Sequence, residues 1–169
     1  IAGASVAAGL VRRGTEVTIL EAGPGLANAA SGNRLALQSP RLTVDHNTAS
    51  RLSATCLAFA ATLSDRASAS VAAPVLAIDW PTREAERHAK FRRQAWPNSL
   101  AVDVSMEAAP AQSGIDINLP AMRHDYGRVI KPAKLIAWLA EGCPVITDFV
   151  VSSCVRDDHG VTVIANDGR

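Results

Sequence analysis

The chain has 169 residues, with 17 Lys and Arg against 16 Asp and Glu, and a formal net charge of +1 at pH 7. This balance gives no strong electrostatic case for a nucleic-acid-binding or membrane-binding protein, and no apolar run approaches the roughly 18–20 residues of a membrane span. Three cysteines, an odd number at irregular spacing, do not indicate a disulfide framework. A reducing cytoplasm is therefore the expected location.

The first stretch, Ile1–Gly23, has the pattern of the second half of a dinucleotide-binding β-α-β unit. Gly3 opens a helix of small residues that is expected to stop at Gly14, and a strand is expected over Val17–Leu20. A helix N-terminus offers N–H groups to a pyrophosphate. Glu21, at the end of the strand, can accept hydrogen bonds from a ribose.

The complete fingerprint is G-x-G-x-x-G after a strand, and only its last glycine, Gly3, is in this sequence. The strand and the other glycines would lie before Ile1, and the chain does not begin with Met. We therefore expect an internal part of a larger flavoprotein. An ordinary αβ unit with a glycine C-cap would give the same half-motif, so that alternative stays open.

The next segment contains two turns and a long helix. The turn around Ser31-Gly32-Asn33 supplies backbone N–H groups, a hydroxyl and an amide that suit phosphates or a ribityl chain, although an ordinary surface loop has the same composition. A helix is expected from about Thr48. Its three- and four-residue spacing predicts a buried apolar stripe, with Cys56 as a buried structural thiol. The residues of this stripe are Ala49, Leu52, Cys56, Phe59 and Leu63.

After a connection over Ser64–Pro74, a strand over Val75–Trp80 and a basic helix over 82–95 are expected. The helix could meet a polyanion such as RNA, but a solvated helix face is the simpler interpretation. His88 is interpreted as an ordinary helix residue. A strand over Leu100–Met106 follows.

His124 and Asp125 are placed in a loop before a helix that begins near Pro132 and ends at Gly142. A hairpin is then expected, with Val145–Val151 and Val161–Ala165 as its strands and the Asp157–Gly160 cluster as its turn.

The sequence has no cluster with metal-ligand spacing, no G-x-S-x-G elbow and no Walker loop. If the protein is an enzyme, a cofactor must therefore supply the difficult chemistry. That inference agrees with the dinucleotide half-motif.

The stretch IAGASVAAGLVRRGTEVTILEAGPGLANAASGNR, followed by Pro40–Leu42, resembles flavoproteins of the D-amino-acid-oxidase/glycine-oxidase superfamily. Within that group it is most similar to the C-terminal oxidoreductase domains of bifunctional proteins that modify the tRNA wobble uridine. Three later stretches keep the family order: Val102–Gly114, Gly127–Leu135 and Val145–Gly168. Arg128 and the segment Leu35–Gln38 depart from the family pattern.

The resemblance implies that FAD is the cofactor and that several residues lie around it. Gly3 and Ala4 would lie near the pyrophosphate, and Glu21 with the adjacent Ala22 would hold the adenosine ribose. The flavin side would be lined by a turn, and Val151 would offer its backbone to the adenine. The residues of that turn are Ser31, Gly32, Asn33 and Arg34. The catalytic residues are not identified.

The fold class implied is α/β: a partial Rossmann-type FAD-binding domain with part of an inserted mixed α+β substrate domain. The expected domains are 1–65, the first part of the FAD-binding domain; 66–125, the substrate-domain insertion; and 126–169, the continuation of the FAD-binding domain. The domain is expected to be incomplete in this chain.

The implied reaction removes the carboxymethyl group oxidatively from 5-carboxymethylaminomethyl uridine in tRNA. The implied partners are tRNA and a methyltransferase domain of the same parent chain, with no membrane. One alternative is a small-molecule amine oxidase of the glycine or sarcosine oxidase type. A second alternative is a non-catalytic fragment that binds no cofactor by itself. We expect these 169 residues alone to bind FAD weakly or not at all and to show no activity.

Overall fold

The computed structural model describes residues 1–43, 45, 47–79, 83–93, 96–158 and 160–169. The chain forms two compact units: residues 1–34 together with 131–169, and residues 35–130. The domain boundaries expected from the sequence, at 65/66 and 125/126, both fall inside the second unit. They remain a prediction about the domains of the family.

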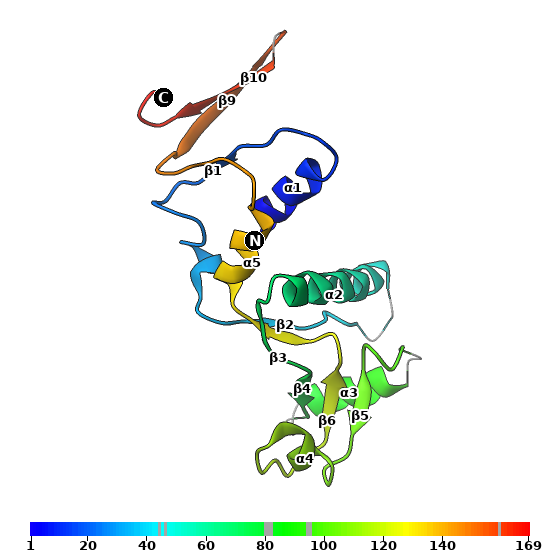
Figure 1. Ribbon diagram of the computed structural model, residues 1–169. Coiled ribbons are helices and arrows are strands. Elements are labelled where there is room, and N and C mark those ends of the chain that lie inside the picture. The colour runs from blue at the N-terminus through cyan, green and yellow to red at the C-terminus, as the bar shows by residue number, and fades with distance from the viewer. Residues whose placement is uncertain (44, 46, 80–82, 94–95, 159) are drawn as a thin grey trace. The chain divides into compact units, whose positions relative to one another are not determined.

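The first unit is built on two helices, α1 (Ala2–Val11) and α5 (Pro132–Leu139), which pack against each other (Figure 1). Small residues on one side of α1, Ala4 and Ala7, are buried and permit the close approach. Helix α1 is followed by Gly14 at φ 79°, a left-handed conformation that glycine adopts without steric cost. The helix and its glycine stop were therefore predicted correctly.

Strand β1 (Ile19–Leu20) pairs in parallel with β8 (Val145–Ile146) in the first unit. The strand expected over Val17–Leu20 is present but shorter. A short 3-10 helix, η1 (Ala30–Gly32), lies beside α5. These elements give the unit a mixed α/β composition.

The hairpin of the first unit has a different first strand from the expected one. Strand β9 (Val151–Asp157) pairs with β10 (Gly160–Ala165) in antiparallel register (Figure 1). The expectation that 145–151 would form the first strand is wrong, because Val145 and Ile146 pair with β1 instead. His159, within the expected turn, lies outside the described residues.

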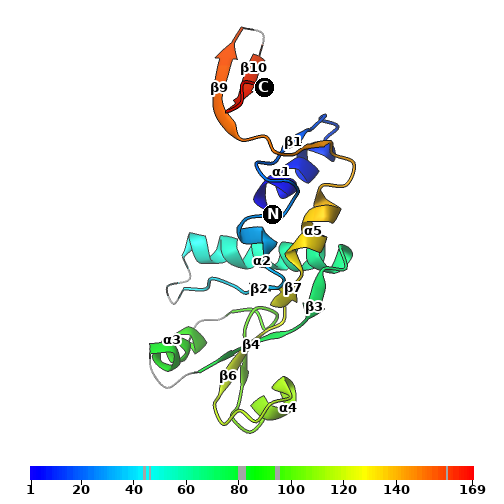
Figure 2. The ribbon, with the colours of Figure 1, turned by 90° about the vertical axis from the view of Figure 1, so that its left-hand side faces the viewer.

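In the second unit, helix α2 (Thr48–Arg66) runs along β2 (Ala36–Gln38) and the segment after it (Figure 2). The stripe predicted to be buried is not buried: Cys56 is exposed, and Leu52 and Phe59 are 63% and 60% exposed. The opposite face is buried instead, through Ser50, Ala54, Leu57, Ala61 and Ser64.

Hydrogen bonds explain why small and polar residues of α2 face inward. Ser50 Oγ accepts from the backbone N–H of Thr43 at 2.9 Å. Ser64 Oγ donates to Oε1 of Gln38 at 3.1 Å. A helix face of Ala and Ser lets the backbone approach closely while each hydroxyl has a partner. The spacing predicted a helix correctly, but residue type alone misassigned its buried face.

The second unit contains a sheet of order β2-β7-β3, in which β7 (Arg128–Ile130) pairs with β3 (Ser70–Ala72) on one side. Strand β3 lies in the segment expected to be a connection, so that expectation was wrong. Gly127 is required at the start of β7, since an added Cβ would come within 2.6 Å of the Cβ of Val75.

A second sheet has the order β4-β6-β5, from β4 (Val75–Ile78), β6 (Ala121–His124) and β5 (Val102–Val104). It is accompanied by helices α3 (Arg83–Arg92) and α4 (Ala109–Ser113). The basic helix was therefore predicted, although the ends of the expected 82–95 range lie outside the described residues. His124 was expected in a loop and instead ends β6.

An ion pair joins the end of α2 to β7. Arg128 donates to both carboxylate oxygens of Asp65, from Nε at 3.2 Å and from Nη2 at 3.1 Å. Ser70 also donates to this carboxylate. The hydrogen bonds from Arg128 and then Ser70 lower the pKa of Asp65 below its ordinary value. Arg128, which departs from the family pattern, thus has a structural role here.

We expect the Asp65 ion pair to stabilise the fold at neutral pH and to lose its effect in acid. A carboxyl whose folded-state pKa is lowered stabilises the fold above its unfolded pKa of about 3.9, and the contribution is lost as the pH falls through the lower folded pKa. Because the side chain of Asp65 is half exposed, Asp65→Asn should cost about 0.5–1 kcal/mol between pH 5 and 7. Urea unfolding of both proteins against pH measures this difference, and a difference that grows below pH 4 would contradict it.

The exposed face of α2 predicts rapid reaction of Cys56 with a thiol reagent in the folded protein. Cys56 and Cys154 are exposed, whereas Cys143 is half-buried. Cys56→Ser should remove one fast-reacting thiol from a native-state titration, as should the matched control Cys154→Ser. An unchanged fast phase in Cys56→Ser would instead support the buried thiol expected from the sequence.

Candidate functional site

Four of the residues expected to contact the cofactor lie together around one cavity of about 170 Å³ in the first unit. Its lining includes Gly3 and Ala4 from α1, Glu21 from the end of β1, and Ser31 from η1. The remaining wall is largely apolar, and it includes Ile19, Leu20, Leu26 and Ile136.

The N-terminal turn of α1 opens onto this cavity. No side chain caps the N-terminus of the helix, so no cap competes with a ligand for the first N–H groups. An added Cβ on Gly3 would meet nothing within 4 Å, which leaves open space directly over the backbone. The terminal ammonium group of Ile1 donates to Oγ of Ser31 at 3.1 Å, so this hydroxyl lies beside the start of the helix.

Glu21 is held at the carboxyl end of β1 by main-chain hydrogen bonds on both sides. Its N–H donates to the carbonyl of Ile146 at 2.9 Å, and its carbonyl accepts from the N–H of Phe149 at 3.0 Å. Its carboxylate oxygen Oε1 accepts from the N–H of Gly23 at 3.0 Å. The half-buried carboxylate is therefore oriented while it still borders the cavity.

The other residues named from the resemblance lie outside the cavity lining. Ala22 and the turn at the end of η1 are exposed, and Val151, which begins β9, is 45% exposed. Phe149, whose N–H donates to the carbonyl of Glu21, lies two residues before Val151 in the sequence. The exposed residues of that turn are Gly32, Asn33 and Arg34.

The sequence reasoning missed the segment that closes the cavity, Leu26–Ala29. Ala27 adopts φ 66°, which a residue other than glycine rarely does. An added Cβ on Gly32 would lie 2.3 Å from the carbonyl oxygen of Ala27, so glycine is required where these two backbones meet. The glycines of this loop were a sequence signal that its backbone makes close contacts. No feature of the sequence indicated that an alanine would adopt a positive φ.

The lining of this cavity offers groups for binding a ligand but few side chains that could take part in a reaction. Glu21 is its one ionisable side chain among the described lining residues. Over the part of the chain that the structure describes, no group of three or more His, Cys, Asp and Glu side chains could hold a metal ion. Helix N–H groups, open space over Gly3 and an oriented carboxylate fit part of a dinucleotide.

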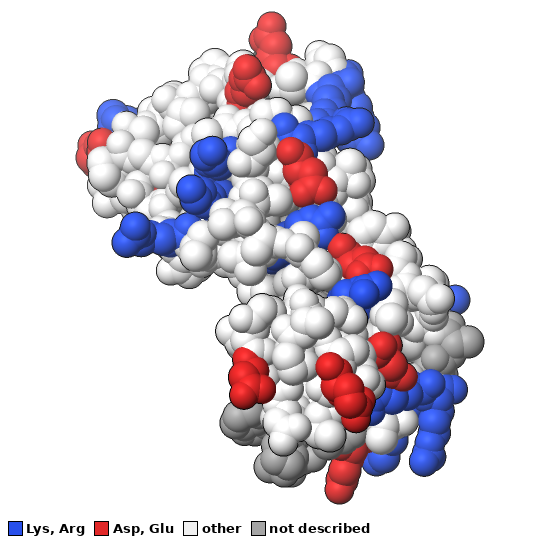
Figure 3. Space-filling view, turned by 60° about the horizontal axis from the view of Figure 1, so that its bottom comes forward, with Lys and Arg blue, Asp and Glu red and all other residues white. Residues whose placement is uncertain are grey.

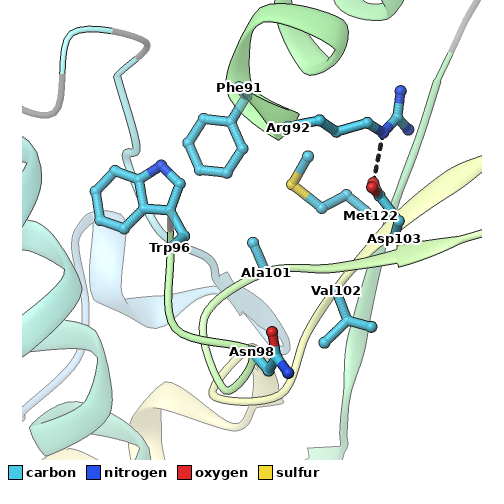
Figure 4. Close-up of a pocket in the computed structure, with 8 residues that line it drawn as sticks. All are labelled: Phe91, Arg92, Trp96, Asn98, Ala101, Val102, Asp103 and Met122. Carbon is cyan, nitrogen blue, oxygen red and sulfur yellow. Dashed lines mark hydrogen bonds and ion pairs between the residues drawn. The ribbon is translucent and has the colours of Figure 1, made fainter. Parts of the chain in front are cut away.

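A second cavity, of about 230 Å³, lies in the second unit (Figure 4). It is bounded by the end of α3, by the segment that follows it and by the sheet. Beside it, Asp79 is 3% exposed, shares a hydrogen bond with Nδ1 of His88 and forms an ion pair with Arg92. His88 is thus more than an ordinary helix residue, because it ties α3 to the end of β4.

Charges on the face seen in Figure 3 are mixed, with Lys and Arg interspersed with Asp and Glu. Within α3, Arg92 is engaged by the carboxylates of Asp79 and Asp103, whereas Lys90 and the following Arg93 are exposed. Part of the basic character of this helix is therefore used inside the unit. No described helix is both long enough and apolar enough to cross a membrane.

Curated proteins similar to this chain include several named tRNA 5-methylaminomethyl-2-thiouridine biosynthesis bifunctional protein MnmC. The relative from Shewanella amazonensis is 31% identical over 175 residues, which cover 95% of this chain and 25% of the relative. The relative from Polaromonas naphthalenivorans is 35% identical over 155 residues, covering 83% of this chain and 23% of the relative. The chain thus spans about a quarter of the length of these relatives.

Solved structures share the fold at low sequence identity. Glycine oxidase from Bacillus cereus superposes with a TM-score of 0.69 at 20% identity, over 98% of this chain and 48% of that one. A thermally stable mutant of fructosyl peptide oxidase superposes with a TM-score of 0.73 at 16% identity, over 99% of this chain and 44% of that one. The mixed α/β fold of this chain is therefore shared with these two oxidase structures.

The sequence model of one protein family, described as FAD dependent oxidoreductase, matches residues 1–169, which are all the residues of this sequence. Together with the cavity at the start of α1, this match shows that the chain belongs to the FAD dependent oxidoreductase family.

Proposed function

We propose that the chain is part of an FAD-dependent oxidoreductase acting on a CH–NH group, and that the cavity of the first unit holds part of the FAD. The observation that carries the proposal is the meeting of Gly3, Glu21 and Ser31 around one cavity. Membership of the FAD dependent oxidoreductase family supports the same assignment. The volume, about 170 Å³, is below the roughly 300 Å³ of a complete small-molecule site, so it suits a portion of the cofactor.

Each residue has a distinct role in this proposal. The first-turn N–H groups of α1, beside Gly3 and Ala4, bind the pyrophosphate, since a helix N-terminus favours negative charge. Glu21, next to Ala22, accepts hydrogen bonds from the ribose. Ser31, which lines the cavity, and four exposed residues outside its lining extend these contacts toward the flavin and the adenine. These residues are Ser31, Gly32, Asn33, Arg34 and Val151.

Bound FAD supplies a two-electron oxidant for a C–H bond next to an amine nitrogen. The substrate that we propose is the carboxymethylaminomethyl group of the tRNA wobble uridine. Loss of two electrons and two protons from its N–CH₂ unit leaves an imine, and water hydrolyses the imine to the aminomethyl uridine and glyoxylate. The names of the relatives, which specify biosynthesis of a tRNA methylaminomethyl uridine, support this choice.

The partners proposed are tRNA and a methyltransferase domain in the same parent chain, because the relatives are described as bifunctional. The proposed location is the cytoplasm, where tRNA is modified. A Rossmann-type arrangement of the complete FAD-binding domain is part of the same proposal, and the parallel pairing of β1 with β8 supports it.

An amine oxidase of the glycine or sarcosine oxidase type is the alternative function. The likeness to glycine oxidase concerns the fold and does not by itself favour that substrate. A further alternative is that this polypeptide alone binds no cofactor. The two-stranded parallel sheet β1-β8 favours weak binding, because parallel strands are usually stabilised inside larger sheets with both faces covered.

We expect the 169-residue chain to bind FAD weakly, and Gly3→Val to remove the binding that remains, because the valine side chain would fill the open space over the helix end. Gly9→Val is the matched control on the same helix, where an added Cβ makes an ordinary 3.8 Å contact with Arg13. Equilibrium dialysis with FAD measures both. If the two variants bind FAD equally, this cavity is not the FAD site. If the purified chain carries one flavin for each polypeptide, the expectation of weak binding is wrong.

The choice of substrate is tested with the complete product of the reading frame that contains this segment. With tRNA that carries 5-carboxymethylaminomethyl uridine, we expect one glyoxylate for each modified uridine consumed. With free glycine or sarcosine, we expect no glyoxylate above background. The reverse pattern would establish the small-molecule oxidase, and an upstream methyltransferase domain in the same frame would agree with tRNA.

A further inference from the structure

The cavity of the second unit has no role in the proposed binding of FAD. Its described lining comes from α3, β5, β6 and the segment between α3 and β5. Figure 4 shows that aromatic and apolar side chains form one side of the cavity, while Asn98, Arg92 and Asp103 supply its polar groups. Its lining thus combines a flat apolar surface with hydrogen-bonding groups.

The flat surface is an aromatic pair. The rings of Phe91 and Trp96 are stacked, with their centroids 5.3 Å apart and an angle of 10° between their planes. Phe91 is buried at 4% exposure, whereas Trp96 is half-buried and borders the cavity. Packing against Phe91 fixes the indole, and a rigid indole offers a stacking surface at low entropic cost.

The polar groups argue against an anionic ligand. Arg92 pairs with Asp79 at 2.5 Å and also with Asp103, so two carboxylates engage its single positive charge. Desolvation lowers the pKa of Arg92, but the hydrogen bonds to Asp103 and Asp79 together with the negative charges of these two carboxylates raise it above its ordinary value. A phosphate would meet the carboxylate of Asp103 rather than an unengaged cation. A neutral ring that carries N–H donors matches this carboxylate and the Asn98 amide.

The size selects a single ring system. The volume of about 230 Å³ is below the roughly 300–1,000 Å³ of sites for drug-sized ligands. RNA-binding proteins recognise unstacked bases by stacking on aromatic side chains and by hydrogen bonds to the base edge. A base that is splayed out of a loop satisfies the size, the neutrality and the donor requirement together.

We propose that this cavity binds one unstacked nucleobase of a single-stranded RNA loop, with the base stacked beside Trp96 and its edge hydrogen-bonded to Asn98 and Asp103. The inference rests on the proposed function, in which tRNA is the substrate. It adds a contact in the second unit that positions the RNA, separate from the cofactor cavity of the first unit.

The test uses the 169-residue chain and a fluorescein-labelled heptauridylate, with binding followed by anisotropy. Trp96→Ala should weaken binding roughly 5- to 150-fold, the range of lost base–aromatic stacking. Trp96→Phe keeps a ring against Phe91 and should recover most of the affinity. Rescue by phenylalanine separates a stacking role from a general effect of the substitution on folding.

Asn98→Ala tests the hydrogen-bonding edge at an exposed position, where it leaves the aromatic packing intact. It should reduce the preference among heptamers of uridine, cytidine and adenosine more than it reduces their mean affinity. Arg93→Ala is the matched control, since Arg93 is exposed and does not line the cavity. It should leave the preference among the heptamers unchanged, because Arg93 lies outside the cavity that contacts the base.

Loss of affinity in Trp96→Ala with rescue by Trp96→Phe supports the nucleobase site. Equal affinities of the wild-type chain and Trp96→Ala would overturn it, as would no binding of any heptamer by the wild-type chain. FAD retention, measured by dialysis on the same proteins, is expected to be unaffected by these variants. A failure of the RNA contact alone is therefore distinguishable from a failure of the cofactor site.

Discussion

The close approach of two backbone segments in the first unit is the constraint on which the candidate cofactor site depends. Gly32 lies so near the carbonyl of Ala27 that any side chain there would collide with it. This contact folds the loop after β1 back toward α1, and Ser31 borders the same cavity as Gly3 and Ala4 of that helix. The N-terminal turn of α1, the Glu21 carboxylate and the Ser31 hydroxyl consequently border one cavity.

The second unit uses polar side chains for a different purpose. Buried Asp79 joins His88 and Arg92 of α3 to the end of β4. The serines of α2 join that helix to β2 and to the segment after β2. Removing one partner from such a group leaves a buried charge or hydroxyl unpaired, which is more costly than the net gain from making the pair. These groups therefore fix how the helices lie on the sheets, and they leave Lys90 and Arg93 exposed for contacts outside the unit.

The sequence predicted α1, its stop at Gly14 and the position of β1 because these features depend on local backbone preferences and on a compact glycine-rich pattern. The family and its FAD dependence were also predicted, since their characteristic residues are concentrated in the same stretch. The buried face of α2 could not be predicted by hydrophobicity, because Ser50 and Ser64 are buried through hydrogen bonds to Thr43 and Gln38, which lie outside the helix. Strand β3 and the pairing of β8 with β1 likewise depend on contacts between distant segments.

The central claim, that the start of α1 and the Glu21 region form part of a dinucleotide site, is tested most directly by nuclear magnetic resonance. The backbone amides of the isotopically labelled chain would be followed while ADP, the dinucleotide half that this region should recognise, is added. The account predicts shifts that are concentrated at Gly3, Glu21, Gly23 and Ser31, with little change in residues 35–130. Shifts confined to residues 35–130, or no shifts at saturating ADP, would contradict it.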